Sequence, residues 1–72
     1  MNESEIAYIL SRIVDNAKDS LDDAAQNPKD DFYAGKKFAY YEMLDTIKNE
    51  LIARGADLED FGLAVDLEKL FL

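Results

Sequence analysis

The first third of the chain alternates apolar and polar residues with the period of an α-helix. Apolar residues recur every three or four positions and form one stripe: Ile6, Leu10, Ile13, Ala17, Leu21 and Ala24. Polar residues occupy the opposite side, a pattern typical of a helix that is buried along one face. Asn2 and Glu5 have the spacing of a capping box, so the pattern predicts a helix over about residues 3–26.

A second helix is predicted over about residues 28–54. The pair Asn27-Pro28 interrupts the first pattern, because a residue that precedes proline disfavours helical backbone angles. Asn27 suits the N-cap of the second helix and Pro28 its first position, while Gly55 suits the residue that follows its end. A connection this short predicts that the two helices pack as an antiparallel hairpin.

The second helix carries two apolar stripes, and the first helix can cover only one of them. The main face contains Tyr33, Tyr40, Met43, Leu44, Ile47 and Leu51. A second stripe, about a quarter turn away, contains Ala34, Phe38, Tyr41 and Ile52. This second stripe therefore needs the C-terminal tail or another subunit to cover it.

The C-terminal tail, residues 56–72, is too apolar to lie free in solvent. Asp57 is expected to cap a short turn that ends at Gly62, and Asp66 a short helix over about residues 66–71. The sequence thus predicts a single all-α domain: an antiparallel helical hairpin with a short C-terminal helical tail, dimerising into a four-helix bundle. The predicted interface consists of Ala34, Phe38, Tyr41, Ile52, Phe61, Leu70 and Phe71.

Composition narrows the chemistry that this domain can perform. Its 72 residues include no cysteine and no histidine, which excludes thiolate metal sites and removes the commonest catalytic base and zinc ligand. The sequence also has no phosphate-binding glycine loop and no nucleophile elbow. We therefore predict no catalytic, cofactor-binding or metal-binding residues, and no enzymatic activity.

Charge suggests two candidate binding surfaces of opposite sign. The net charge of −8 argues against broad binding to nucleic-acid backbones. Asp15, Asp19, Asp22 and Asp23 cluster on the first helix, where they could attract a basic partner but lack the loop of a calcium hand. Lys36, Lys37 and Tyr40 form a basic-aromatic patch that could stack bases, although the tyrosine is better explained as core.

The chain is expected to be cytoplasmic. Residues 1–5 contain two acids and no base, whereas a secretory signal begins with basic residues. The longest apolar run, Ile6 to Leu10, is far too short to span a bilayer.

The stretch from Phe32 to Leu51, which begins FYAGKKFAYYE, resembles small uncharacterised helical proteins of Gram-positive bacteria and their mobile elements. That group has no assigned activity, so the resemblance implies no functional residue. In outline, the chain is also similar to the small plasmid-copy-number regulator that dimerises as a helical hairpin. That similarity implies only that an acidic hairpin dimer can still bind a nucleic acid.

The sequence is compatible with three functions. The leading hypothesis is a non-enzymatic interaction or regulatory protein that acts through self-association, as a homodimer, or through partner binding. The alternative is an acidic decoy or inhibitor of a nucleic-acid-binding protein, which would use the aspartates of the first helix. A weaker alternative is nucleic-acid binding through the lysines of the second helix.

Overall fold

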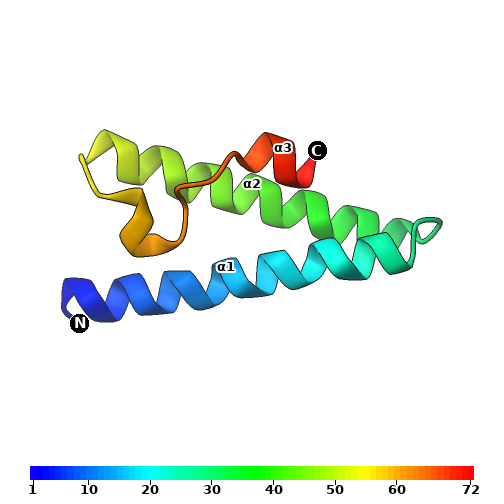
Figure 1. Cartoon of the computed structure of the whole chain (residues 1–72), viewed down its shortest axis with the longest axis horizontal. Coiled ribbons are helices and arrows are strands. Elements are labelled where there is room, and N and C mark those ends of the chain that lie inside the picture. Colours follow the sequence, from blue (N-terminus) through cyan, green and yellow to red (C-terminus); the bar gives the residue numbers. More distant parts are fainter.

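The computed structural model describes all 72 residues and contains helices but no strands (Figure 1). The elements are the long helices α1 (Glu3–Gln26) and α2 (Asp31–Ala53), the 3-10 helix η1 (Leu58–Phe61) and the short helix α3 (Leu67–Phe71). The predicted all-α class is confirmed, and the two long helices pack against each other as a hairpin. None of the helices combines enough length with enough apolar character to cross a bilayer.

Helix α1 has the bounds that its apolar pattern predicts, because its N-terminus is capped as expected. The Asn2 side chain accepts a hydrogen bond from the Glu5 backbone N–H at 2.8 Å. In return, the Glu5 carboxylate accepts one from the Asn2 backbone N–H at 3.4 Å. This reciprocal pair satisfies two amide groups that have no partner within the helix.

Helix α2 begins three residues later than predicted, so the assignment of Asn27 and Pro28 to its start is wrong. The Asn27 side-chain amide instead donates to the Asp23 carbonyl at 2.9 Å and closes α1. The Asp30 carboxylate accepts from the Phe32 backbone N–H at 3.0 Å and caps α2. Pro28 therefore lies in the turn between the helices, which the hydrogen bond from the Asp30 N–H to the Asn27 carbonyl closes.

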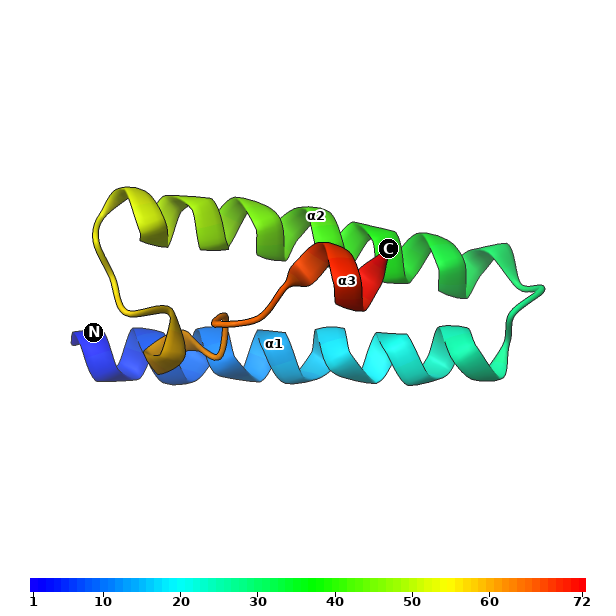
Figure 2. The same cartoon turned by 45° about the horizontal axis from the view of Figure 1, so that its top comes forward.

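The C-terminal tail folds back over one face of the hairpin. Figure 2 shows η1 and α3 lying in front of the two long helices. Gly55 and Gly62 have positive φ angles of 70° and 72°, a conformation that lets the chain turn at both ends of η1. Asp57 caps η1 and Asp66 caps α3, as the sequence predicts.

The core lies between the hairpin and the tail. Four of its seven buried apolar residues come from the tail, and Leu63 among them is 0 % exposed. The hairpin contributes Val14, Ala17 and Leu44, and the tail contributes Phe61, Leu63, Leu67 and Phe71. The tail is therefore an integral wall of the core, since two helices alone form a layer that encloses no interior.

Candidate interaction surfaces

The face of the hairpin opposite the tail has no cover. The Lys36 ammonium pairs with the Asp23 carboxylate at 3.8 Å and joins the two helices along this side. Residues seven or fourteen apart lie close to the same line of a helix. Ile9 therefore lies on the side of Asp23, and Met43 on the side of Lys36. Ile9 and Met43 thus belong to one side of the hairpin.

The tail occupies the other side of the same two helices. Val14 lies beside Gly62 of the tail, and the Lys48 ammonium donates a hydrogen bond to the Val65 carbonyl. Val14 is five residues beyond Ile9, and Lys48 is five beyond Met43, so each is turned about 140° around its helix. We call the uncovered side the open face; its apolar residues are Ile6, Ile9, Ile13, Tyr40, Met43 and Ile47.

The open face keeps large apolar side chains in contact with solvent. Ile6, Ile9 and Met43 are 41 %, 44 % and 49 % exposed, respectively. Ile13, Tyr40 and Ile47 are half-buried and pack against the core at their inner ends. Periodicity assigns both Met43 and Leu44 to the face that packs on the first helix; Leu44 is buried there at 1 % exposure, whereas Met43 lies at the exposed edge of that face.

Charges of both signs border the open face. On α1, the seven-residue spacing of Glu5, Arg12 and Asp19 produces a line of alternating sign beside Ile9. On α2, Lys36 and Glu50 lie on the line of Met43, and the Arg54 guanidinium bonds the Glu50 carboxylate at 2.5 Å. The border is thus close to neutral, although the chain as a whole carries −8.

A second apolar surface lies where α3 packs beside α2. The rings of Phe38 and Tyr41 are tilted by 32° with centroids 6.0 Å apart. Phe38 of α2 and Leu70 of α3 are exposed, whereas Tyr41 is half-buried. We call Phe38, Tyr41 and Leu70 the aromatic patch.

The aromatic patch has acidic surroundings. Burial raises the pKa of Tyr41, and the negative charges of Asp45, Glu68 and Asp66 raise that pKa further. Two of these carboxylates, Asp66 and Glu68, belong to the tail, which carries five acids and one base. Lys37 of α2 and Lys69 of α3 are the bases beside the patch, so its border has an excess of acids, whereas that of the open face is close to neutral.

The seven predicted interface residues do not form one surface. Phe61 and Phe71 are buried in the core of their own chain, so their assignment to an interface is wrong. They are buried because the tail turns at Gly62 and inserts both rings beneath the hairpin. Ala34, Phe38, Ile52 and Leu70 remain exposed, and Tyr41 is half-buried beside the tail. The tail thus covers only part of the second stripe.

The four aspartates of the predicted acidic face have different surroundings. Asp15 pairs with Arg12 at 3.7 Å, and Asp23 pairs with Lys36 at 3.8 Å across the hairpin. Asp19 and Asp22 are exposed and have no ionic partner within the chain. No three acidic side chains converge as a metal site would require. Part of the predicted acidic face is therefore neutralised internally.

The predicted basic-aromatic patch is likewise divided. The Lys36 ammonium is held by Asp23, and Tyr40 is half-buried against the core. Lys37 is half-buried and has no ionic partner. A stacking platform needs a ring face open to a base, whereas Tyr40 directs much of its surface into the protein.

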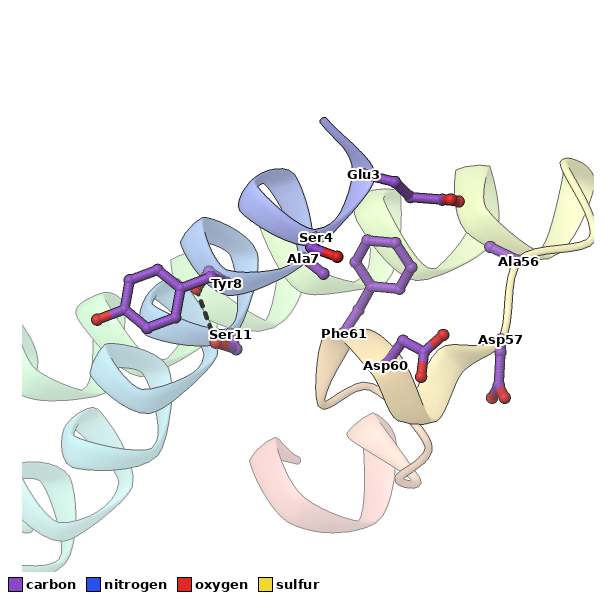
Figure 3. Close-up of a pocket in the computed structure, with 9 residues that line it drawn as sticks. All are labelled: Glu3, Ser4, Ala7, Tyr8, Ser11, Ala56, Asp57, Asp60 and Phe61. Carbon is purple, nitrogen blue, oxygen red and sulfur yellow. Dashed lines mark hydrogen bonds between the residues drawn. The ribbon is translucent and has the colours of Figure 1, made fainter. Parts of the chain in front are cut away.

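A cleft of about 440 Å³ lies between the start of α1 and η1 (Figure 3). The Phe61 ring points toward Ser4 and Ala7, and the carboxylates of Glu3 and Asp60 lie on either side of it. The Ser11 hydroxyl donates to the Tyr8 carbonyl at 2.7 Å. Sequence inspection missed this cleft because its walls come from opposite ends of the chain. Its lining comprises Glu3, Ser4, Ala7, Tyr8, Ser11, Ala56, Asp57, Asp60 and Phe61.

The structure thus presents two exposed apolar surfaces with different charge borders and an acidic cleft. The open face combines residues of α1 and α2, while the aromatic patch combines residues of α2 and α3.

No protein-family model, curated protein or solved structure matches this chain.

Proposed function

We propose that this chain is a non-enzymatic interaction protein that self-associates through the open face. Two hairpins that pair in this way form a four-helix bundle with both tails on the outside. The observation that carries the proposal is the set of incompletely covered apolar side chains on one side of both helices, Ile9 and Ile13 of α1 and Met43 and Ile47 of α2. Apolar faces of this kind on soluble helical hairpins are typical of association surfaces.

The size of the open face supports pairing with a second copy. The molecule extends 41 Å along its longest axis. Two helices side by side are about 20 Å wide, so the footprint of the face is about 800 Å². Each partner in a standard-sized protein interface contributes about this area.

The charge border also favours a second copy. A twofold axis placed between Glu5 and Arg12 would bring Glu5 of each copy against Arg12 of the other. Because each chain carries a net charge of −8, two copies also repel each other over a longer range. Added salt screens this repulsion, so we expect salt to strengthen the dimer.

The expected affinity follows from the exposed apolar residues. Completing the burial of a half-exposed isoleucine or methionine contributes roughly 1 kcal/mol. Ile6, Ile9 and Met43 each contribute twice in a symmetric dimer, and loss of translational freedom opposes the total. The contribution of these three residues alone is below the roughly 8 kcal/mol that a micromolar dissociation constant requires, so a dimer of that affinity must also bury the remaining apolar surface of Ile13, Tyr40 and Ile47.

The hydrogen bonds support a non-enzymatic role. The only bonds between two side chains join Asn49 to Asp45 and Arg54 to Glu50. Neither pair contains a nucleophile together with a base that could activate it. The alternative role as an acidic decoy has less support, because Asp15 and Asp23 are engaged within the chain.

Substitution on the open face tests the proposal. Met43→Glu should remain folded and sediment as a monomer at concentrations where the wild type is a dimer. Ile52→Glu is the matched control, since Ile52 is 55 % exposed on α2 but lies away from the open face. A wild-type monomer at high micromolar concentration contradicts the proposal. So does a result in which Ile52→Glu dissociates and Met43→Glu does not.

A further inference from the structure

We infer that the aromatic patch is a docking site for a basic amphipathic helix of a partner protein. The patch lies along α2 and α3, separate from the open face. It consists of Phe38 and Tyr41 of α2 and Leu70 of α3. The site does not depend on self-association, so each of the two proposals can fail without the other.

The patch offers apolar anchoring surface. Phe38 is 49 % exposed although it packs against Tyr41, so one side of the ring pair is fixed and the other is free. Leu70 of α3 remains exposed, whereas its neighbour Phe71 is buried in the core. Exposed aromatic and aliphatic side chains that already pack against a neighbour are typical binding anchors, because they lose little conformational entropy when a partner covers them.

The charges around the patch specify the chemistry of the partner. Asp45 lies one turn beyond Tyr41 on α2, and Asp66 and Glu68 lie at the start of α3, which packs against α2. The nearby Lys48 ammonium donates to the Val65 carbonyl, and Lys37 and Lys69 are the other bases near the patch, so carboxylates are in excess there. Carboxylates beside an apolar surface attract a partner with lysine or arginine next to its apolar residues.

The same charges disfavour two other occupants. A second copy on this patch would bring Asp45, Asp66 and Glu68 against a surface of the same sign, whereas the open face has a mixed border. A nucleic acid would bring phosphates against these carboxylates. The expected partner element is a helix. Phe38 and Tyr41, three residues apart on α2, form one row of apolar side chains, and α3 supplies a second row beside them across which a helix could lie.

A defined peptide tests this inference on the full chain. The probe is a fluorescently labelled helix of leucine and lysine about five turns long, with leucine at i, i+3, i+4 and i+7. Two control peptides keep its length: one scrambles the leucine positions, and the other replaces every lysine by glutamate. Fluorescence anisotropy should detect binding of the first peptide alone, and the binding should weaken as salt is added.

Variants locate the site. Phe38→Ser and Leu70→Ser should each weaken peptide binding by roughly tenfold. Glu68→Gln should weaken it less and reduce its salt dependence. Phe32→Ser is the matched control, because Phe32 is also an exposed phenylalanine of α2 but is turned about 120° around the helix from Phe38. Circular dichroism and urea unfolding of each variant establish that it is folded.

Three results overturn the inference. The first is no binding of the leucine-lysine peptide by the folded wild type. The second is equal binding of the scrambled peptide, which would indicate charge attraction without a site. The third is unchanged affinity in both Phe38→Ser and Leu70→Ser. A monomeric Met43→Glu variant that still binds the peptide would separate this site from the open face.

Discussion

The ammonium group of Lys48 in α2 donates a hydrogen bond to the backbone carbonyl of Val65, in the segment that joins η1 to α3. This bond links the tail to the hairpin at the point where the chain passes between two core residues, Leu63 and Leu67. The carbonyl is partly buried, so it would otherwise lose its contact with water without gaining a partner. This side-chain hydrogen bond thus adds to the contacts of the apolar core residues that hold the tail on the hairpin.

Removing the Lys48 donor should loosen the tail. Lys48→Met keeps most of the side-chain volume but leaves the Val65 carbonyl without its partner, at a cost of about 1–3 kcal/mol in the free energy of unfolding. Urea unfolding followed by circular dichroism measures this change. Lys18→Met is the control, because Lys18 is exposed and forms no ion pair. Equal stability of the two variants would show that the contact contributes nothing.

The tail should be essential to the stability of the whole domain. Leu63 is 0 % exposed, so Leu63→Ala leaves a cavity and should cost about 2–5 kcal/mol. A domain of 72 residues has only about 4–11 kcal/mol of stability in total, so the variant should be strongly destabilised. Leu70→Ala, at an exposed position, should cost less than about 1 kcal/mol. Similar unfolding midpoints for both variants would contradict the role of the tail as a wall of the core.

Several local features were predictable because neighbouring residues determine them. The capping box of Asn2 and Glu5 and the caps at Asp57 and Asp66 depend on spacings of two or three residues. The start of α2 was mispredicted because Asn27 and Asp30 can both act as caps. The Asn27 side-chain amide donates to the backbone carbonyl of Asp23 and so closes α1, and Asp30 therefore caps α2.

The candidate surfaces were less predictable, because they depend on which face of the hairpin the tail covers. Periodicity placed Met43 in the interior and left Phe61 and Phe71 available for an interface. A tail that crosses one face buries both phenylalanines and leaves Met43 exposed on the other face. No local pattern in the sequence determines on which side the tail lies.

Asp30 should stabilise the N-terminus of α2 by capping it. Asp30→Ala removes the acceptor of the Phe32 N–H and a negative charge near the helix N-terminus, and should cost about 0.5–2 kcal/mol. Asp31→Ala removes a neighbouring charge without removing a cap, so it should cost only a few tenths of a kcal/mol. Urea unfolding distinguishes the two variants. A neutral effect of Asp30→Ala would show that the helix does not begin at this cap.

Ionisation of Tyr41 should lower the stability of the folded protein at alkaline pH. Its pKa is raised in the folded protein by burial and by nearby carboxylates, so the folded state favours the neutral phenol. The resulting stabilisation is present below the unfolded pKa of about 10 and is lost as pH rises through the folded pKa. The urea midpoint should therefore fall above pH about 10, and Tyr41→Phe should reduce that fall. An identical alkaline dependence in the two proteins would refute this prediction.

The central claim, self-association through the open face, is tested most directly by isotope-filtered NMR on a mixture of labelled and unlabelled chains. Magnetisation transfer between the two kinds of chain reports only contacts between copies. The proposed dimer predicts intermolecular contacts from the methyl groups of Ile6, Ile9 and Met43, and none from Ile52. The absence of any intermolecular contact in a concentrated sample, or contacts confined to Ile52 and Leu70, would contradict it.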